Sequence, residues 1–141
     1  MIHIVLEGTN NNILNNITYN DYPQNSTWRR NLRINEAAIL GMNEVDYNLY
    51  ETTDPIQTFF SGASSYIKAT WESYKSTLGF DANSPAPTDP LFTTASSDTF
   101  YIDNNSPAYN AGTNLWFITT DYYGNLRDDG TFDIGAHEYT P

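Results

Sequence analysis

The sequence predicts an all-β protein of short strands joined by tight polar bends, with one amphipathic helix. Asn and Thr each occur 17 times, and Asn forms helices and strands poorly but tolerates left-handed bends. Short runs of alternating apolar and polar residues recur between these Asn-rich corners. Leu, Ile, Val and Phe number only 29 of the 141 residues, so we expect a thin aliphatic core supplemented by aromatic side chains.

In the first half of the chain, four segments show the alternation that half-buried strands have. They are Met1–Leu6, Asn12–Tyr19, Arg30–Asn35 and Val45–Tyr50. Turn-forming residues separate them at Glu7–Asn12 and Asp21–Thr27. Asn side chains at such corners can hydrogen-bond one another in stacked ladders, which an architecture of repeated bends would use.

The segment Ser64–Gly79 has a different period and predicts the helix. Its large apolar side chains fall on one helical stripe, which we expect to pack against the strands. They are Ile67, Trp71, Tyr74 and Leu78. Ser64 or Ser65 is suited to cap the start of this helix, and Gly79 to end it.

The last third of the chain reads as loops with few strands. Asn83–Pro90 contains three prolines and predicts a rigid extended connector. Thr99–Asp103 is a short strand by pattern, Asp121–Gly130 is a polar loop, and Phe132–Tyr139 predicts a last strand.

Composition excludes several classes of function. The net charge of −11, with only six basic residues, argues against a nucleic-acid backbone or an anionic membrane as partner. No apolar run approaches the length of a membrane span, so we expect no membrane insertion. The chain has no Cys, which excludes disulfides, thiolate zinc sites and thiol nucleophiles.

Several motifs follow one another in order toward the C-terminus. They are Asp89-Pro90-Leu91-Phe92, Ser106-Pro107-Ala108, Ala111-Gly112, Asp121, Gly124, Arg127, Asp133-Ile134-Gly135-Ala136 and Glu138. With the Trp71 helix and Asn48-Leu49-Tyr50, this order resembles the C-terminal end of right-handed parallel β-helix proteins of the pectate-lyase-like fold. That family includes bacterial polysaccharide lyases, glycosidases and secreted surface proteins. The resemblance covers about residues 45–139, with Asn110 and His137 departing from the usual pattern.

The resemblance implies a short right-handed parallel β-helix forming one domain. Residues 1–60 would form rungs, 61–80 a helical insertion, and 81–141 the C-terminal rungs and cap. Such proteins usually carry more rungs, so we expect a C-terminal fragment or a natural short form. The uncapped N-terminal end predicts a homo-oligomer through exposed edge strands. We expect a secreted or cell-surface location, without a recognisable signal peptide in these residues.

The implied function is a carbohydrate-active module that binds or degrades a polysaccharide as a glycosidase or lyase. The alternative is a non-catalytic structural or carbohydrate-binding end-domain. A third possibility is a small complete enzyme that works as an oligomer. The acidic balance favours a neutral glucan or xylan over an anionic polymer.

No catalytic residue can be assigned from the sequence. The best candidates for a carbohydrate-facing patch are Trp28, Arg30, Arg33, Asp46 and Tyr50, although such residues more often merely solvate an exposed sheet face. A carboxylate pair for glycoside hydrolysis can be drawn from Glu44, Asp46 and Glu51, but chance proximity is the simpler explanation in so acidic a chain.

No cofactor and no metal site is predicted, with Ca²⁺ as the one possible ion. The loop Asp121–Gly130 offers oxygen ligands of the type that Ca²⁺ accepts, but it lacks the spacing of a calcium-binding loop. A structural role is favoured there, with Arg127 paired to Asp133 or Asp121. His3 and His137 are the only histidines and lack metal-ligand spacing.

Overall fold

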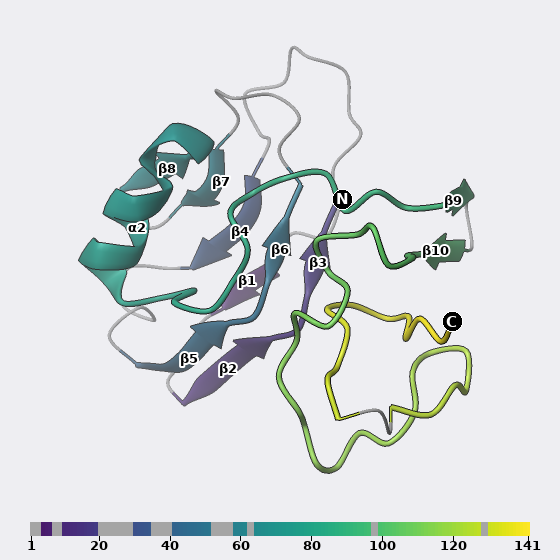
Figure 1. Ribbon diagram of the computed structural model, residues 1–141. Coiled ribbons are helices and arrows are strands. Elements are labelled where there is room, and N and C mark those ends of the chain that lie inside the picture. Colours follow the sequence, from purple (N-terminus) through teal and green to yellow (C-terminus); the bar gives the residue numbers. More distant parts are fainter. Residues whose placement is uncertain are drawn as a thin grey trace.

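The computed structural model describes residues 4–6, 10–19, 30–34, 41–51, 58–61, 64–96, 99–127 and 130–141. Figure 1 shows how the described strands and the short α-helix α2 are arranged. The first eight strands are β1 (Ile4–Leu6), β2 (Asn11–Leu14), β3 (Ile17–Thr18), β4 (Arg30–Ile34), β5 (Met42–Asp46), β6 (Leu49–Tyr50), β7 (Thr58–Ser61) and β8 (Ser65–Ile67). They are followed by a 3-10 turn at Lys68–Thr70, α2 (Trp71–Leu78), β9 (Thr94–Ser96) and β10 (Thr99–Tyr101).

The chain passes through three sheets in the same order twice. The first pass is β1, β2 and β3, and the second pass is β4, β5 and β6. Each strand of the second pass pairs in parallel with its counterpart in the first, as Ile4↔Leu32, Ile13↔Val45 and Ile17↔Leu49 show. β7 then adds to β4 in parallel, and β8 pairs with β7 antiparallel. The four-stranded sheet therefore has the order β1-β4-β7-β8.

Both passes turn the same corner. Asn15 lies between β2 and β3 with φ 57°, and Tyr47 lies between β5 and β6 with φ 56°. Left-handed backbone is usual for Asn but costs about 1–2 kcal/mol for a residue such as Tyr. The next residues, Asn16 and Asn48, are stacked, with the Asn16 amide donating to Asn48 Oδ1 at 3.0 Å. The predicted Asn ladder is confirmed at this corner.

α2 covers the strands on the side of β7 and β8 (Figure 1). Trp71 and Tyr74 are buried there, packed with Tyr50, Tyr66 and Phe80, as the apolar stripe predicted. The predicted cap at Ser64 or Ser65 is wrong, because Ser65–Ile67 pairs with β7 and the α-helix begins only at Trp71. Gly79 ends it in the left-handed conformation, φ 70°, as expected.

The C-terminal part forms a second, smaller core around Leu49. Ile102, Ala108 and Ile134 are buried in it, with Ile17 packed against them. β9 and β10 form an antiparallel hairpin at its edge. The predicted strand Phe132–Tyr139 is not formed. Backbone N–H groups there donate to side-chain carboxylates instead of to a neighbouring strand.

The prediction of a right-handed parallel β-helix is wrong. The described residues contain one four-stranded sheet and three two-stranded sheets, with short parallel pairings, and no closed solenoid. After β7 the chain reverses into β8 and α2, and β9 and β10 pair antiparallel. The C-terminal motifs form bonded turns: the Ser106 hydroxyl, for example, donates to the carbonyl of Pro90. The division at residues 60 and 80 stays a prediction. No helix among the described residues is long and apolar enough to cross a bilayer.

Candidate functional site

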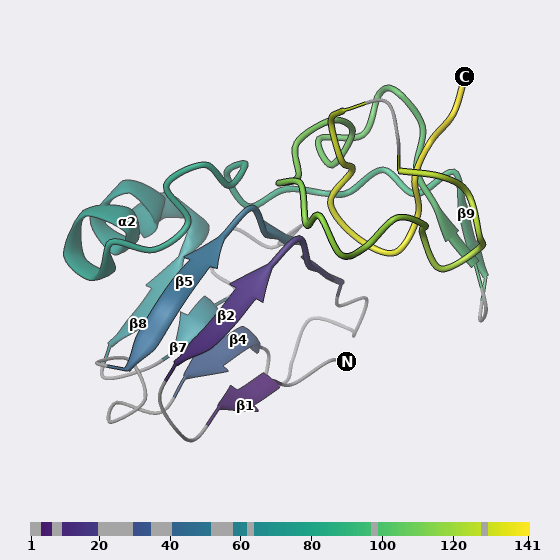
Figure 2. The ribbon, with the colours of Figure 1, turned by 90° about the horizontal axis from the view of Figure 1, so that it is seen from below.

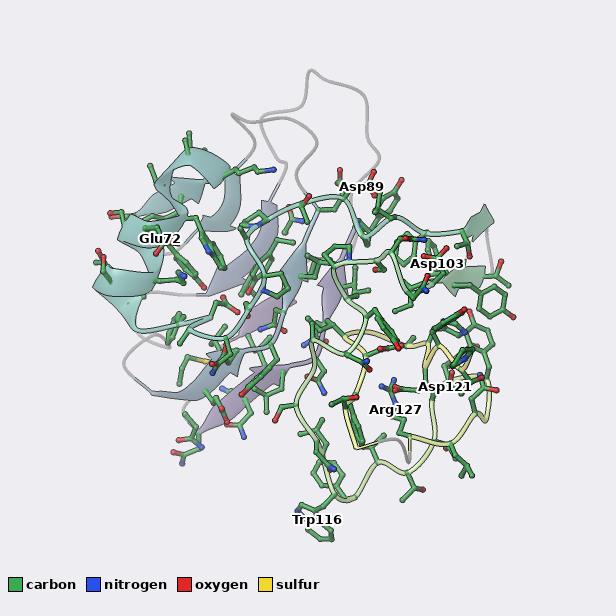
Figure 3. The ribbon with its side chains drawn as sticks, viewed as in Figure 1. Glu72, Asp89, Asp103, Trp116, Asp121 and Arg127 are labelled. Carbon is green, nitrogen blue, oxygen red and sulfur yellow. The ribbon has the colours of Figure 1, made fainter. Side chains whose placement is uncertain are left out.

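The most unusual surface feature is a loop that holds large apolar side chains in solvent. Trp116 is 86% exposed and Phe117 is 65% exposed, and Ile118 beside them is also exposed. These three residues are the aromatic tip. The Trp116 and Phe117 rings meet edge to face, with centroids 5.6 Å apart. Trp116 lies at the far end of the C-terminal loops, away from the strands (Figure 3).

One end of this loop, at Thr113, is hydrogen-bonded to Asn15, the corner residue between β2 and β3. The Asn15 amide donates to the carbonyl of Thr113 at 2.7 Å, and Asn15 Oδ1 accepts from the N–H of Thr113 at 2.8 Å. Gly112 precedes Thr113, and its N–H donates to the carbonyl of Phe132 at 2.7 Å. A Cβ at Gly112 would lie 2.8 Å from the Phe132 carbonyl oxygen, so this close approach requires glycine.

The other end of the loop, at Thr119 and Thr120, is closed by a short antiparallel contact. Thr120 and Leu126 form a β-bridge, and the N–H of Arg127 donates to the carbonyl of Thr119 at 2.9 Å. Leu126 is 58% exposed, so it adds apolar surface next to the bridge. The loop is therefore tied down at both ends, which holds the aromatic tip on a defined base.

Arg127 anchors this second end of the loop in the smaller core. Its guanidinium donates to Glu138 Oε2 at 2.6 Å and to the carbonyls of Asp133 and Gly135 at 3.0 and 2.7 Å. Both partners of the ion pair are buried, with side chains 6% and 2% exposed. The prediction that Arg127 pairs with an Asp is wrong in its partner, since the carboxylate is that of Glu138.

Asp121 shapes the turn on the far side of the bridge. Its two oxygens accept from the N–H groups of Tyr123, Asn125 and Glu138 and from the Asn125 amide, at 2.8 to 2.9 Å. Burial raises the pKa of Asp121, but these hydrogen bonds outweigh it, so its pKa lies below the ordinary 3.8. The Asp121 carboxylate is thus occupied in holding the loop.

No cluster of three or more His, Asp or Glu side chains suited to a metal ion occurs in the part of the chain that is described. Asp128 and Asp129, which belong to the predicted Ca²⁺-compatible loop, lie outside that part. The possibility of Ca²⁺ therefore stays a prediction.

The residues predicted for a carbohydrate-facing patch are not brought together as one described surface. Trp28 lies outside the described residues. Arg30 and Arg33 lie on β4, and only the backbone of these two residues is described. Asp46 and Tyr50 are 7% and 1% exposed, so they belong to the interior.

Asp46 and Tyr50 serve a buried network around Asp81. Asp81 Oδ2 accepts from the hydroxyls of Tyr50 at 2.8 Å and Tyr74 at 2.6 Å, and Oδ1 accepts from Ser84 and from Asn48. Burial raises the pKa of Asp81 above its ordinary 3.8, and the hydrogen bonds only partly offset this.

Asp46 joins the same corner of the structure by accepting from the backbone N–H and the side-chain amide of Asn83, at 2.8 and 2.7 Å. Of the carboxylates considered for hydrolysis, Glu51 is also buried and only Glu44 is exposed. The buried carboxylate of Asp46 therefore has a structural role, because it holds Asn83 in place.

Sequence reasoning missed the aromatic tip. Leu115–Ile118 is a short apolar run, and such a run predicts a buried strand as readily as an exposed loop. The available signal was its position between the turn-forming Gly112-Thr113-Asn114 and the polar Thr119-Thr120.

What the aromatic tip can do chemically is bind. Its side chains offer flat apolar faces and one donor, the Trp116 indole N–H. No protein family, curated protein or solved structure was found that matches the chain. The aromatic tip is therefore the one feature of the described residues from which we infer a function.

Proposed function

We propose that the chain is a carbohydrate-binding module that holds a neutral polysaccharide on its aromatic tip. The observation that carries the proposal is the 86% exposure of Trp116 on a loop tied down at both bases. Burying large aromatic side chains is favourable, so leaving Trp116 and Phe117 in water forgoes stability that a ligand would restore.

Sugar rings suit such a surface because the C–H groups on one face of a pyranose pack flat against an aromatic ring. The proposal names a neutral polymer because the chain carries a net charge of −11. A polyanion such as pectate would be repelled at low ionic strength, whereas an uncharged glucan or xylan would not.

The proposal is binding and not catalysis because the described carboxylates near the loop are already engaged. Asp121, Asp133 and Glu138 are buried and accept hydrogen bonds from backbone N–H groups. A general acid or base must reach the bond it acts on, and these side chains are held inward.

Affinity electrophoresis through gels containing xylan, a neutral β-glucan or pectate tests this proposal. We expect retardation by at least one neutral polymer and none by pectate. Trp116→Ala should abolish the retardation, and Trp116→Phe should retain part of it because a flat ring remains. Trp116→Leu keeps apolar area without a flat face and should behave like the Ala variant.

Leu91→Ala is the matched control, since Leu91 is another exposed apolar residue, at 49% exposure, elsewhere on the surface. It should bind like the unchanged chain. The proposal fails if no neutral polymer retards the protein, or if Trp116→Ala and Leu91→Ala are retarded equally.

A further inference from the structure

The aromatic tip is built on a tight turn that carries its two rings at successive positions. The N–H of Ile118 donates to the carbonyl of Leu115 at 2.7 Å, which closes a β-turn with Trp116 and Phe117 as its central residues. Because the chain reverses direction across these two residues, their side chains leave the backbone in different directions. Leu115 is half-buried, whereas both rings lie in solvent.

The two rings on this turn lie almost at right angles to each other. The planes of Trp116 and Phe117 differ by 84°, with the centroids 5.6 Å apart, so the edge of one ring meets the face of the other. Edge-to-face contact is a favoured geometry for aromatic pairs, and turning the two rings into one plane would forfeit it. The pair therefore offers two flat surfaces that meet at a corner, and not one flat platform.

The aromatic tip lies where a long polymer can reach it. Figure 2 shows the C-terminal loops beyond the ends of β2 and β5, on the side away from α2, and Figure 3 shows Trp116 at the far end of these loops. Thr119, Thr120 and Leu126, which close the loop next to the tip, are also exposed. A polymer chain can therefore lie across the tip without meeting the strands or α2.

The angle between the two rings selects for the shape of the sugar polymer. An aromatic ring holds a pyranose by its C–H face, so each bound sugar lies parallel to the ring beneath it. The exposed sugar faces of a flat crystalline polymer are all parallel, so only one of two perpendicular rings can lie on them. In a single chain in solution, rotation about the glycosidic bonds turns successive sugars relative to one another. Two rings 5.6 Å apart can then each contact a sugar of the same chain.

We propose that the aromatic tip binds single, twisted chains of a neutral polysaccharide, such as dissolved xylan, and not the flat faces of a crystalline polymer. Trp116 and Phe117 contact neighbouring sugars of one chain, one ring to each sugar. On a crystal face Trp116 would stack alone and Phe117 would stand edge-on, which would lose part of the buried area. This inference rests on the proposed function, because it names the form of the polymer that the same site takes.

Depletion of the protein by two forms of cellulose tests this inference. Microcrystalline and acid-swollen, amorphous cellulose contain the same sugar and the same linkage, and they differ in how flat and ordered their chains are. Dissolved xylan, measured by affinity electrophoresis, is a further neutral polymer. We expect binding to xylan, to amorphous cellulose or to both. Binding to microcrystalline cellulose, compared at equal accessible surface area, should be weaker by about tenfold or more.

Variants of the second ring show whether one chain uses both rings. Phe117→Ala should weaken binding to the dissolved or amorphous polymer about five- to tenfold, because one of the two stacking contacts is lost. Phe117→Tyr keeps a flat ring at the same place and should bind like the unchanged chain. Phe117 is 65% exposed, so neither substitution should disturb the fold. Leu91→Ala is again the control and should leave binding unchanged.

The possible results separate this inference from the proposed function. Clear binding to microcrystalline cellulose, as strong as that to the other polymers, would overturn the inference and leave carbohydrate binding by Trp116 standing. Unchanged binding of xylan or amorphous cellulose by Phe117→Ala would do the same, because the second ring would then not take part. The absence of binding to every neutral polymer would overturn both the inference and the proposed function.

Discussion

Asp81 is the acceptor at the centre of a buried hydrogen-bond network. Its carboxylate is fully buried and accepts from two tyrosine hydroxyls, one serine hydroxyl and one amide. Burial raises the pKa of Tyr50 and of Tyr74, and their contact with Asp81 raises both further. Both phenols therefore stay protonated and act as donors.

Asp81→Ala should lower the free energy of unfolding by at least about 3 kcal/mol, because several buried donors lose their acceptor at once. Urea denaturation followed by far-ultraviolet circular dichroism measures the change. Asp89→Ala, at an exposed Asp that accepts one bond from the N–H of Leu91, should cost less than about 1 kcal/mol. Similar losses for both variants would contradict this account of the network.

His137 is the residue that should make stability depend on pH. Its Nδ1 accepts from the N–H of Ile102 at 3.2 Å, and its ring packs against Tyr101 and Tyr123. Burial lowers the pKa of His137 below the ordinary 6.5, partly opposed by nearby Asp121 and Asp133. The neutral form, which can accept the Ile102 hydrogen bond, is therefore the one that the fold prefers.

A lowered histidine pKa contributes stability that is complete above the unfolded pKa of about 6.5 and is lost as pH falls through the folded value. His137→Asn keeps an acceptor but does not titrate. We expect the unchanged chain to lose more stability than this variant when the pH is lowered from 7.5 to 5.5. Parallel curves of unfolding midpoint against pH would show that His137 is not the group responsible.

At the scale of elements, the C-terminal loops are held in place by hydrogen bonds from side chains, much as the strands are held by backbone hydrogen bonds to their neighbours. The bidentate clamp from Asn15 to Thr113 joins the first corner of the chain to the base of the aromatic tip. Arg127 fixes the other end of the loop to the carbonyls of Asp133 and Gly135, which follow it closely in sequence. One end of the loop is therefore held by a residue distant in sequence and the other by a neighbouring segment.

Asn15→Gly should remove the clamp without straining the left-handed backbone at this corner. We expect a loss of about 1–2 kcal/mol in unfolding free energy, together with weaker retardation on the neutral polysaccharide. Asn10→Gly is the control, because Asn10 is exposed and has a similar backbone, φ 65°. If both variants bind and unfold alike, the clamp does not position the tip.

At the scale of the whole molecule, the excess of negative charge opposes the folded state. With 17 acidic and six basic residues, repulsion among like charges is stronger in the folded chain than in the expanded one. Raising NaCl at pH 7 should therefore raise the thermal midpoint. The same salt change near the isoelectric point of about 4.2 should have a smaller effect, and equal shifts at both pH values would refute the explanation.

Local pattern predicted local structure well. The stripe through Trp71 and Tyr74 identified the helix, and the Asn-rich corners identified the stacked amides of Asn16 and Asn48. The predicted fold class was wrong because a pattern of short strands and bends does not determine whether the chain continues in parallel or reverses after β7. Tyr50 and Asp46 looked like surface residues because only Asp81 and Asn83, more than 30 residues away, explain their burial.

The stack of amides at the shared corner has a direction. Asn16 donates to Asn48, and Asn48 donates to Asp81, whose carboxylate only accepts. A side-chain amide both donates and accepts hydrogen bonds, so a further pass of strands carrying an asparagine could be added before Asn16. The row cannot continue in the same direction after Asp81, because its carboxylate has no proton to donate. Any lengthening of this protein by duplication, natural or engineered, would have to insert its new turns before that aspartate.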